Sequence, residues 1–214
     1  MKPFAILLSL VLPLSLVCAQ DAKPPVEKAP EAKESKGYAV GAVVADFSLN
    51  DLEGKKTSLK SIGEGKKYIV LNFWSRNCPA AQICEPLFVK LNTDYSSKGV
   101  AMVHIASNKQ ENKVEADVTA TKTYAKDHKI TWPVLLDVDN KIADVFGGQA
   151  TPHVYVIDVK DMKVVYAGAV TDNDWKPAEL KQEHVKEALD LLLAGKPVAT
   201  SSTKPKGCTI KRVR

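Results

Sequence analysis

The chain has 214 residues, of which 45% are hydrophobic and 26% are charged, and its formal net charge is +5. This length suits one domain with appendages, and the composition excludes a chain that is disordered throughout or buried in a membrane. The 30 Lys and Arg residues do not gather on one periodic face beside base-reading or stacking side chains, so nucleic acid is not an expected partner.

Residues 1–19 carry the pattern of a signal peptide. Lys2 precedes an apolar run over residues 4–17, which is shorter than the roughly 20 residues of a membrane-spanning helix. Val17 and Ala19 fit the positions before a signal-peptidase cut, which leaves Gln20 as the first mature residue. We therefore expect export to the periplasm or the cell exterior, without a stable membrane span. Lipid attachment through Cys18 is a minor alternative.

Two segments lack the apolar side chains that a packed core needs. Residues 20–39 are mainly Pro, Ala, Lys and Glu, and we expect them to form a disordered linker. Residues 196–214 contain Pro, Ser and Lys after the last helical pattern, and we expect a flexible basic tail. The folded domain is therefore predicted to span residues 40–195.

Extended and helical patterns alternate through this domain. The patterns predict strands at residues 43–49, 56–59, 68–74, 100–106, 132–137, 153–158 and 163–168, and helices at residues 79–98, 114–128, 141–146 and 177–193. The first two strands are separated by a turn and predict a β-hairpin. The order of the elements predicts an α/β fold, with a central mixed sheet that has helices on both faces.

Cys78 is the residue whose position most clearly indicates a reactive side chain. It directly follows the buried strand at residues 68–74 and directly precedes a helix that has Pro79 at its first position. The free N–H groups and the positive dipole end of that helix favour a thiolate over a thiol. A buried, inert cysteine is the alternative, but strand-to-helix junctions lie at the exposed edge of such sheets.

Two sequence runs resemble the thioredoxin-like superfamily. Residues 73–79 (FWSRNCP) resemble the thioredoxin active-site run, with Pro86 at the helix kink, and residues 150–158 (ATPHVYVID) resemble its cis-proline strand. The resemblance implies a thioredoxin-like fold with Pro152 in the cis form beside Cys78. It also implies that Thr151 offers backbone groups to an extended peptide. Residues assigned to shaping the site are Trp74, Ser75, Arg76, Asn77, Thr151 and Pro152.

Other segments narrow the resemblance. Residues 40–49 with Gly54 and Lys55 resemble the start of peroxiredoxins and of exported thioredoxins, and the strand and helix inserted between Cys78 and Pro152 belong to the same redoxin branch. The closest resemblance is to an AhpC/TSA-type, peroxiredoxin-like subgroup that ends in a basic Gly-Cys-Ser/Thr-Ile-Lys tail, here residues 207–211. A thiol-based oxidoreductase follows from this resemblance.

The sequence departs from both well-known activities of the superfamily. A dithiol reductase has a second cysteine at the position of Ala81, so its fast dithiol cycle is unavailable here. A peroxidase has a proline at the position of Leu71 and an arginine later in the domain, yet no arginine lies between Arg76 and Arg212. Peroxidases also have a Thr or Ser three residues before the cysteine, and Ser75 meets this requirement. Arg76 is a candidate for the missing cation.

Cys84 and Cys208 are the candidate resolving thiols. Cys84 is six helical residues from Cys78, a rise of roughly 9 Å, so a disulfide between them requires the helix to unwind. It also lies on the apolar stripe of this helix, which favours a core role. Cys208 lies on the predicted tail, whose length allows it to reach the site. A thiol on a partner protein is the third alternative.

The four histidines lack the spacing of metal ligands, and neither a metal nor another cofactor is expected. His153 either tunes Cys78 or packs away from it. The leading hypothesis is a Cys78 thiolate that attacks the disulfide of a protein or a peroxide and is later regenerated by an unknown thiol reductant. The alternative is a non-catalytic binding module that presents the cis-proline edge to a protein partner.

Overall fold

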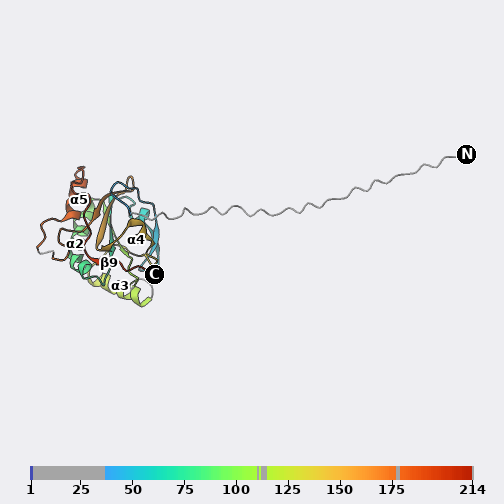
Figure 1. Ribbon diagram of the computed structural model, residues 1–214, viewed down its shortest axis with the longest axis horizontal. Coiled ribbons are helices and arrows are strands. Elements are labelled where there is room, and N and C mark those ends of the chain that lie inside the picture. Colours follow the sequence, from blue (N-terminus) through green and yellow to red (C-terminus); the bar gives the residue numbers. More distant parts are fainter. Residues whose placement is uncertain (2–36, 110, 112–114, 177–178, 214) are drawn as a thin grey trace. The chain divides into compact units, whose positions relative to one another are not determined.

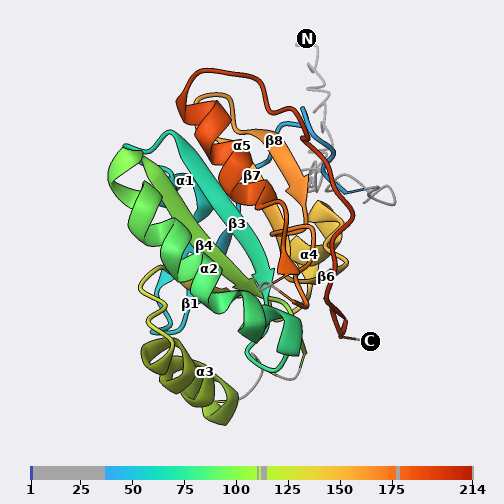
Figure 2. The same cartoon turned by 90° about the vertical axis from the view of Figure 1, so that its left-hand side faces the viewer.

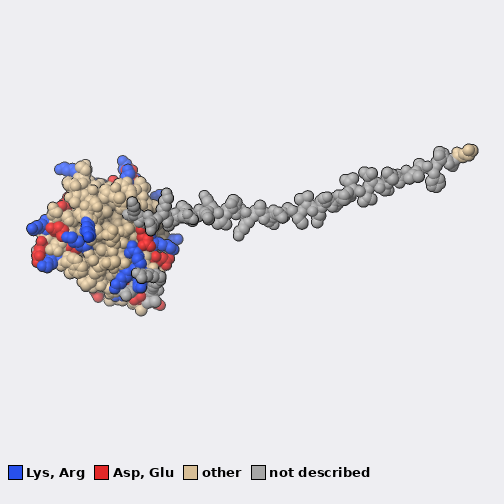
Figure 3. Space-filling view, in the orientation of Figure 1, with Lys and Arg blue, Asp and Glu red and all other residues tan. Residues whose placement is uncertain are grey.

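The computed structural model describes residues 1, 37–109, 111, 115–176 and 179–213 (Figure 1). The predicted signal peptide beyond Met1 and the predicted linker up to residue 36 lie outside these residues. Figure 3 shows Lys and Arg side chains interspersed with Asp and Glu around a mostly uncharged middle of the face in view. No helix in the described part of the chain is long and apolar enough to cross a membrane.

A seven-stranded mixed sheet forms the centre of the domain, in the order β2-β1-β5-β4-β3-β7-β8. Its strands are β1 (Ser48–Asp51), β2 (Lys56–Ser58), β3 (Tyr68–Trp74), β4 (Val100–Ala106), β5 (Val134–Leu136), β7 (His153–Asp158) and β8 (Lys163–Gly168). β3, β4 and β5 run parallel, whereas the other pairs are antiparallel. The predicted α/β fold and its β1–β2 hairpin are confirmed.

Helices cover both faces of this sheet. They are α1 (Leu59–Ile62), α2 (Pro79–Tyr95), the 3-10 turn η1 (Ser96–Lys98), α3 (Glu115–Asp127), α4 (Lys141–Phe146) and α5 (His184–Leu193). Figure 2 shows α2 and α5 side by side in front of the central strands. Since side chains alternate along β3, Val70 and Trp74 join the core under α2 and α5, while Leu71 and Phe73 join the core that includes α1 and α4 residues.

The predicted helix at 177–193 is too long. α5 begins at His184, and the described residues 179–183 before it are not α-helical; two aspartates bind the chain here. Buried Asp174 accepts hydrogen bonds from the Val170 and Thr171 amides, and Asp172 accepts hydrogen bonds from the amides of two residues further along. Side-chain acceptors of this kind compete with the helical hydrogen-bond ladder, which explains the late start of α5.

The C-terminal segment differs most from the sequence-based expectation of a flexible tail. Residues 196–213 follow the surface of the domain, and β9 (Cys208–Thr209) pairs antiparallel with the short strand β6 (Ala150–Thr151). Ile210 is only 3% exposed and belongs to the core that contains Phe73 and Phe146. This apolar residue and the backbone pairing outweigh the polar composition on which the prediction rested.

Candidate active site

Cys78 occupies the junction that the sequence predicted for it. It is the N-cap residue of α2, and its carbonyl accepts the first helical hydrogen bond, from the amide of Gln82 at 3.0 Å. Pro79 begins the helix without losing a hydrogen bond, because the first helical amides have no partner within the helix. No side chain caps these amides at Cys78, and the positive end of the α2 dipole lies at this residue.

A disulfide joins Cys78 to Cys208, with Cα atoms 5.9 Å apart across a sequence separation of 130 residues. Cys78 is 2% exposed, whereas Cys208 is partly exposed. The Sγ atom of Cys78 lies 2.9 Å from the carbonyl oxygen of Thr151. Of the candidate partners for Cys78, the structure therefore brings Cys208 to it.

The Thr151–Pro152 peptide bond is cis, as the resemblance implied. The edge beside it is already occupied, because Ala150 pairs with Thr209 and Thr151 pairs with Cys208. Thr151 Oγ1 also donates to the carbonyl of Cys208 at 3.4 Å. The backbone that the sequence analysis assigned to an incoming peptide is thus taken by the chain's own C-terminal segment.

Cys84 is kept apart from this pair. It is a free cysteine, completely buried in the core under α2 and α5, and its Sγ lies 3.5 Å from the carbonyl oxygen of Asp174. Burial raises the pKa of the Cys84 thiol well above its usual range, and the nearby Asp174 and Glu85 carboxylates raise it further. A thiol in this state is a poor nucleophile, which matches the core role that its place on the apolar stripe favoured.

Glu111 holds the loop that precedes Cys78. Its Oε1 atom accepts hydrogen bonds from Ser75 Oγ at 2.7 Å and from the Asn77 amide at 2.8 Å. Burial raises the pKa of the Glu111 carboxyl, while the hydrogen bonds from Ser75 and Asn77 oppose that rise. The sequence analysis missed Glu111, because nothing in a polar segment 36 residues after Ser75 signals that it folds back onto this loop.

The Arg76 side chain, which the sequence analysis considered as a possible cation for the thiolate, is engaged in other polar contacts. Its Nε donates to Thr121 Oγ1 at 3.1 Å, and a terminal nitrogen lies 3.8 Å from Asp117, both on α3. Its other terminal nitrogen donates to Asn77 Oδ1 at 3.1 Å. The guanidinium is therefore bound to α3 and to Asn77 in the loop before Cys78.

Trp74 is completely buried, so it supports the site from inside the core and does not line its surface. Its Nε1 donates to Glu85 Oε2 at 3.0 Å, and its ring stacks on His104 with centroids 5.4 Å apart. Glu85 Oε1 lies 3.5 Å from His104 Nε2. The sequence analysis missed this buried group, because Glu85 and His104 lie in segments whose patterns indicated only an amphipathic helix and a buried strand.

His153 packs within the core, which is the second of the two interpretations given for it in the sequence analysis. Its ring packs against Tyr155 and Phe73, and its Nδ1 accepts a hydrogen bond from the Gln149 amide at 3.3 Å. Burial lowers the pKa of His153 to about 4, so the ring is neutral at physiological pH. No cluster of three or more His, Cys, Asp or Glu residues suited to a metal ion occurs among the described residues.

Known proteins resemble this chain over most of the domain. Residues 40–167 match the model of the AhpC/TSA family. The thiol-disulfide oxidoreductase ResA of Bacillus cereus is 31% identical over 160 residues, which are 74% of this chain and 79% of that protein.

Solved structures are similar as well. The crystal structure of an uncharacterized conserved protein from Geobacillus kaustophilus has a TM-score of 0.73 at 30% identity, covering 84% of this chain and 95% of that one. The thioredoxin domain of a thiol-disulfide oxidoreductase from Bacteroides vulgatus, at 22% identity, has a TM-score of 0.54 and covers 67% of this chain and 97% of its own. The predicted thioredoxin-like fold is confirmed.

Proposed function

Because the chain belongs to the AhpC/TSA family, we propose that it is a thiol-based oxidoreductase that alternates between a Cys78/Cys208 dithiol and a Cys78–Cys208 disulfide. The observation that carries this proposal is the bridge itself, formed at the N-terminus of α2 beside cis-Pro152. A second cysteine at the position of Ala81 is then unnecessary, since Cys208 supplies the second thiol from the other end of the chain.

Cys78 is the attacking thiolate in this proposal. The first-turn amides of α2 and its dipole stabilise the negative charge on Cys78 Sγ, whereas Cys208 lies in the short strand β9 and is not the cap of a helix. A thiolate stabilised in this way is also the better leaving group when the disulfide is reduced again. Cys208 acts as the resolving thiol.

The oxidising step has two versions. With a disulfide, Cys78 Sγ bonds to one substrate sulfur and the other leaves as a thiolate; the Cys208 thiolate then attacks Cys78 Sγ and releases the first sulfur as a second thiolate. With a hydroperoxide, Cys78 Sγ bonds to the terminal oxygen, the O–O bond breaks and an alcohol or water leaves. Cys208 then attacks the resulting sulfenic acid, and water leaves. In both versions the two thiols lose two electrons.

Regeneration requires an external dithiol that reduces the bridge by exchange. The sequence features favour export of the mature protein, because residues 1–19 have the order of a signal peptide. The C-terminal run of residues 207–211 supports a place in the peroxiredoxin-like subgroup within the family. In our proposal the functional unit spans residues 40–213, since the resolving cysteine lies beyond the predicted domain end at residue 195.

A three-variant comparison tests the proposal. Reduced wild-type protein, Cys78→Ser, Cys208→Ser and the matched control Cys84→Ser are each treated with one equivalent of hydrogen peroxide or of hydroxyethyl disulfide. Their products are then mapped by mass spectrometry. We expect a Cys78–Cys208 peptide pair in the wild type and in Cys84→Ser. Cys208→Ser should stop at a sulfenic acid or mixed disulfide on Cys78, and Cys78→Ser should stay reduced. Oxidation that persists in Cys78→Ser at the wild-type rate would refute the proposal.

A further inference from the structure

Cys208 and Thr209 pair with the strand edge next to cis-Pro152, and the segment of residues 207–213 that contains them is held by much more than its disulfide. Downstream of Cys208, the Ile210 amide donates to the Gln149 carbonyl at 3.1 Å, and the Ile210 side chain is buried in the core. A Cβ atom on Gly148 would lie 3.3 Å from Ile210 Cδ1, which shows how closely this side chain seats on the domain.

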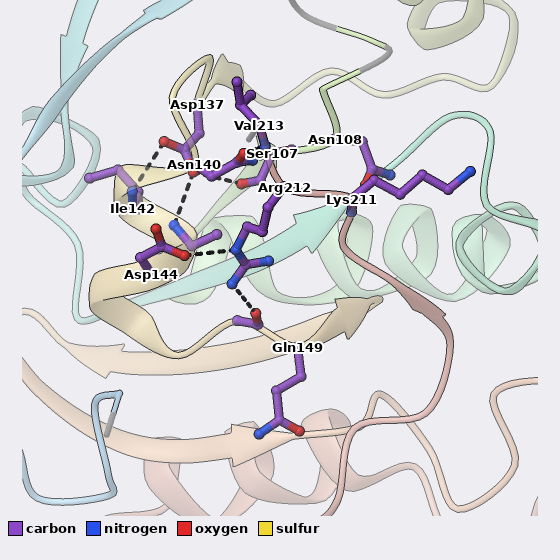
Figure 4. A network of polar contacts seen from close by, with 12 residues as sticks. Ser107, Asn108, Asp137, Asn140, Ile142, Asp144, Gln149, Lys211, Arg212 and Val213 are labelled. Atoms are coloured by element: carbon purple, nitrogen blue, oxygen red, sulfur yellow. Dashed lines mark hydrogen bonds and ion pairs between the residues drawn. The ribbon is translucent and has the colours of Figure 1, made fainter. Parts of the chain in front are cut away.

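Polar contacts fix the last residues beyond Ile210 (Figure 4). The Lys211 amide donates to Asn108 Oδ1 at 2.7 Å, and the Val213 amide donates to Asn140 Oδ1. The Arg212 guanidinium donates to Asp144 Oδ1 and to the Gly148 carbonyl, both at 2.7 Å. These partners come from three separate loops and from α4, so the segment is bound across a broad surface.

The chain upstream of Cys208 is fixed as well. Thr203 Oγ1 accepts from the Ala169 amide at 2.9 Å and lies 2.7 Å from the Tyr166 hydroxyl. The amide of Thr203 donates to the carbonyl of Ala167 at 3.0 Å, and Lys206 Nζ donates to the carbonyl of Asp172 at 2.8 Å. Cys208 therefore lies between two anchored stretches, and none of these hydrogen bonds involves a cysteine sulfur.

We propose that residues 207–213 act as a built-in strand that takes the place of a polypeptide substrate at the Ala150–Thr151 edge, and that they remain docked when the Cys78–Cys208 bridge is reduced. An extended peptide binds such an edge through main-chain hydrogen bonds, and here the partners of that edge are already used. This inference rests on the proposed function and deepens it, because it sets the substrate class. The docked segment keeps disulfides within extended polypeptides from reaching Cys78. Oxidants that are too small to require strand pairing can still react with it.

Gly207 provides a way to move this segment without touching a cysteine. A Cβ atom at this position would collide with the Thr151 carbonyl and lie 3.1 Å from the nitrogen of Pro152. The substitution Gly207→Ala therefore forces the segment away from the cis-proline edge. Thr209→Ala is the matched control, because Thr209 is exposed and lies two residues away in the same segment.

The test compares two oxidants that carry the same reactive group. One is hydroxyethyl disulfide, and the other is an extended peptide whose single cysteine carries a mercaptoethanol mixed disulfide. The rate at which the Cys78 thiol disappears is measured for reduced wild type, Gly207→Ala and Thr209→Ala. We expect the small disulfide to react with wild type roughly tenfold faster than the peptide, or more, and Gly207→Ala to remove most of that difference by accelerating the peptide. Thr209→Ala should behave as wild type.

Equal wild-type rates for the two oxidants, or an unchanged peptide rate in Gly207→Ala, would overturn the inference while leaving the proposed function intact. Failure of the proposed function has a different signature, namely no Cys78–Cys208 bridge with either oxidant or with hydrogen peroxide. Hydrogen exchange on the unmodified protein gives a second test that needs no variant. The amides of Ile210 and Lys211 should stay protected in the reduced protein, and loss of their protection on reduction would contradict the docked segment.

Discussion

Glu85 Oε1 lies 3.5 Å from His104 Nε2, although both side chains are almost completely buried. Glu85 comes from α2, whose N-cap residue is Cys78, and His104 comes from the middle of β4. Trp74, the last residue of β3, donates its indole N–H to the other carboxylate oxygen of Glu85. One buried side chain thus connects β3, α2 and β4.

Removing Glu85 alone should destabilise the protein strongly. Glu85→Ala leaves the buried Trp74 indole N–H without its acceptor, and a buried donor left unsatisfied in this way costs about 1–3 kcal/mol. Urea unfolding monitored by tryptophan fluorescence measures the loss. In a double-mutant cycle with His104→Ala, we expect a coupling of about 0.5–3 kcal/mol, as found for contacting residues. Additive effects of the two substitutions would show that the pair does not interact.

The buried Glu111 carboxyl predicts a pH-dependent stability. Burial raises its pKa above the ordinary value of 4.5, so the folded protein holds this proton more tightly than the unfolded chain. The free energy of unfolding should therefore fall, relative to Glu111→Gln, as pH rises from about 4.5 through the raised pKa. Glutamine keeps an oxygen for the Ser75 and Asn77 hydrogen bonds and does not titrate, which makes it the control.

Urea unfolding of the wild type and Glu111→Gln at several pH values between about 4 and 8 measures this difference. The free energy of unfolding of the wild type should fall relative to that of the variant as the pH rises through this range. A difference that stays constant, or that changes in favour of the wild type with rising pH, would show that the carboxyl is not held in its protonated form by burial.

The sequence predicted the sheet and the place of Cys78 because both depend on local patterns. The run at residues 68–74 is continuously apolar, and Pro79 marks the start of a helix directly after Cys78. The predicted start of α5 was wrong, because the aspartates that bind the chain before this helix act through the folded loop and leave no mark on the sequence periodicity.

The long-range parts of the site carried no comparable signal. Cys208 was one of three open alternatives for the resolving thiol, since a spacing of 130 residues says nothing about contact. Ile210 is a single apolar residue within a basic run, and its burial becomes evident only when Phe73 and Phe146 are in place around it. Glu111 is equally hidden, because the Ser75 and Asn77 groups that it binds are brought to it by the fold.

The external reductant should attack Cys208 and not Cys78. Cys78 is 2% exposed in the bridged structure, whereas Cys208 is partly exposed. Attack on Cys208 also expels the Cys78 thiolate, which the N-terminus of α2 stabilises. Oxidised protein treated briefly with a monothiol and quenched in acid should carry the thiol adduct on Cys208, with Cys78 free. Peptide mapping reads this out, and an adduct found mainly on Cys78 would contradict the assignment.

The bridge should also stabilise the fold, because it closes a loop of 130 residues that the unfolded chain would otherwise leave open. Chain-entropy estimates for loops of this size give about 4–5 kcal/mol, with smaller values when the reduced chain retains structure. Urea unfolding of the oxidised wild type, of the reduced wild type and of Cys208→Ser measures the effect. We expect the oxidised protein to have the higher midpoint, and the other two to agree closely, since the anchors at Ile210 and Arg212 do not depend on the bridge. If reduction instead lowered stability far beyond the loop estimate, the C-terminal segment would have to detach when the disulfide opens.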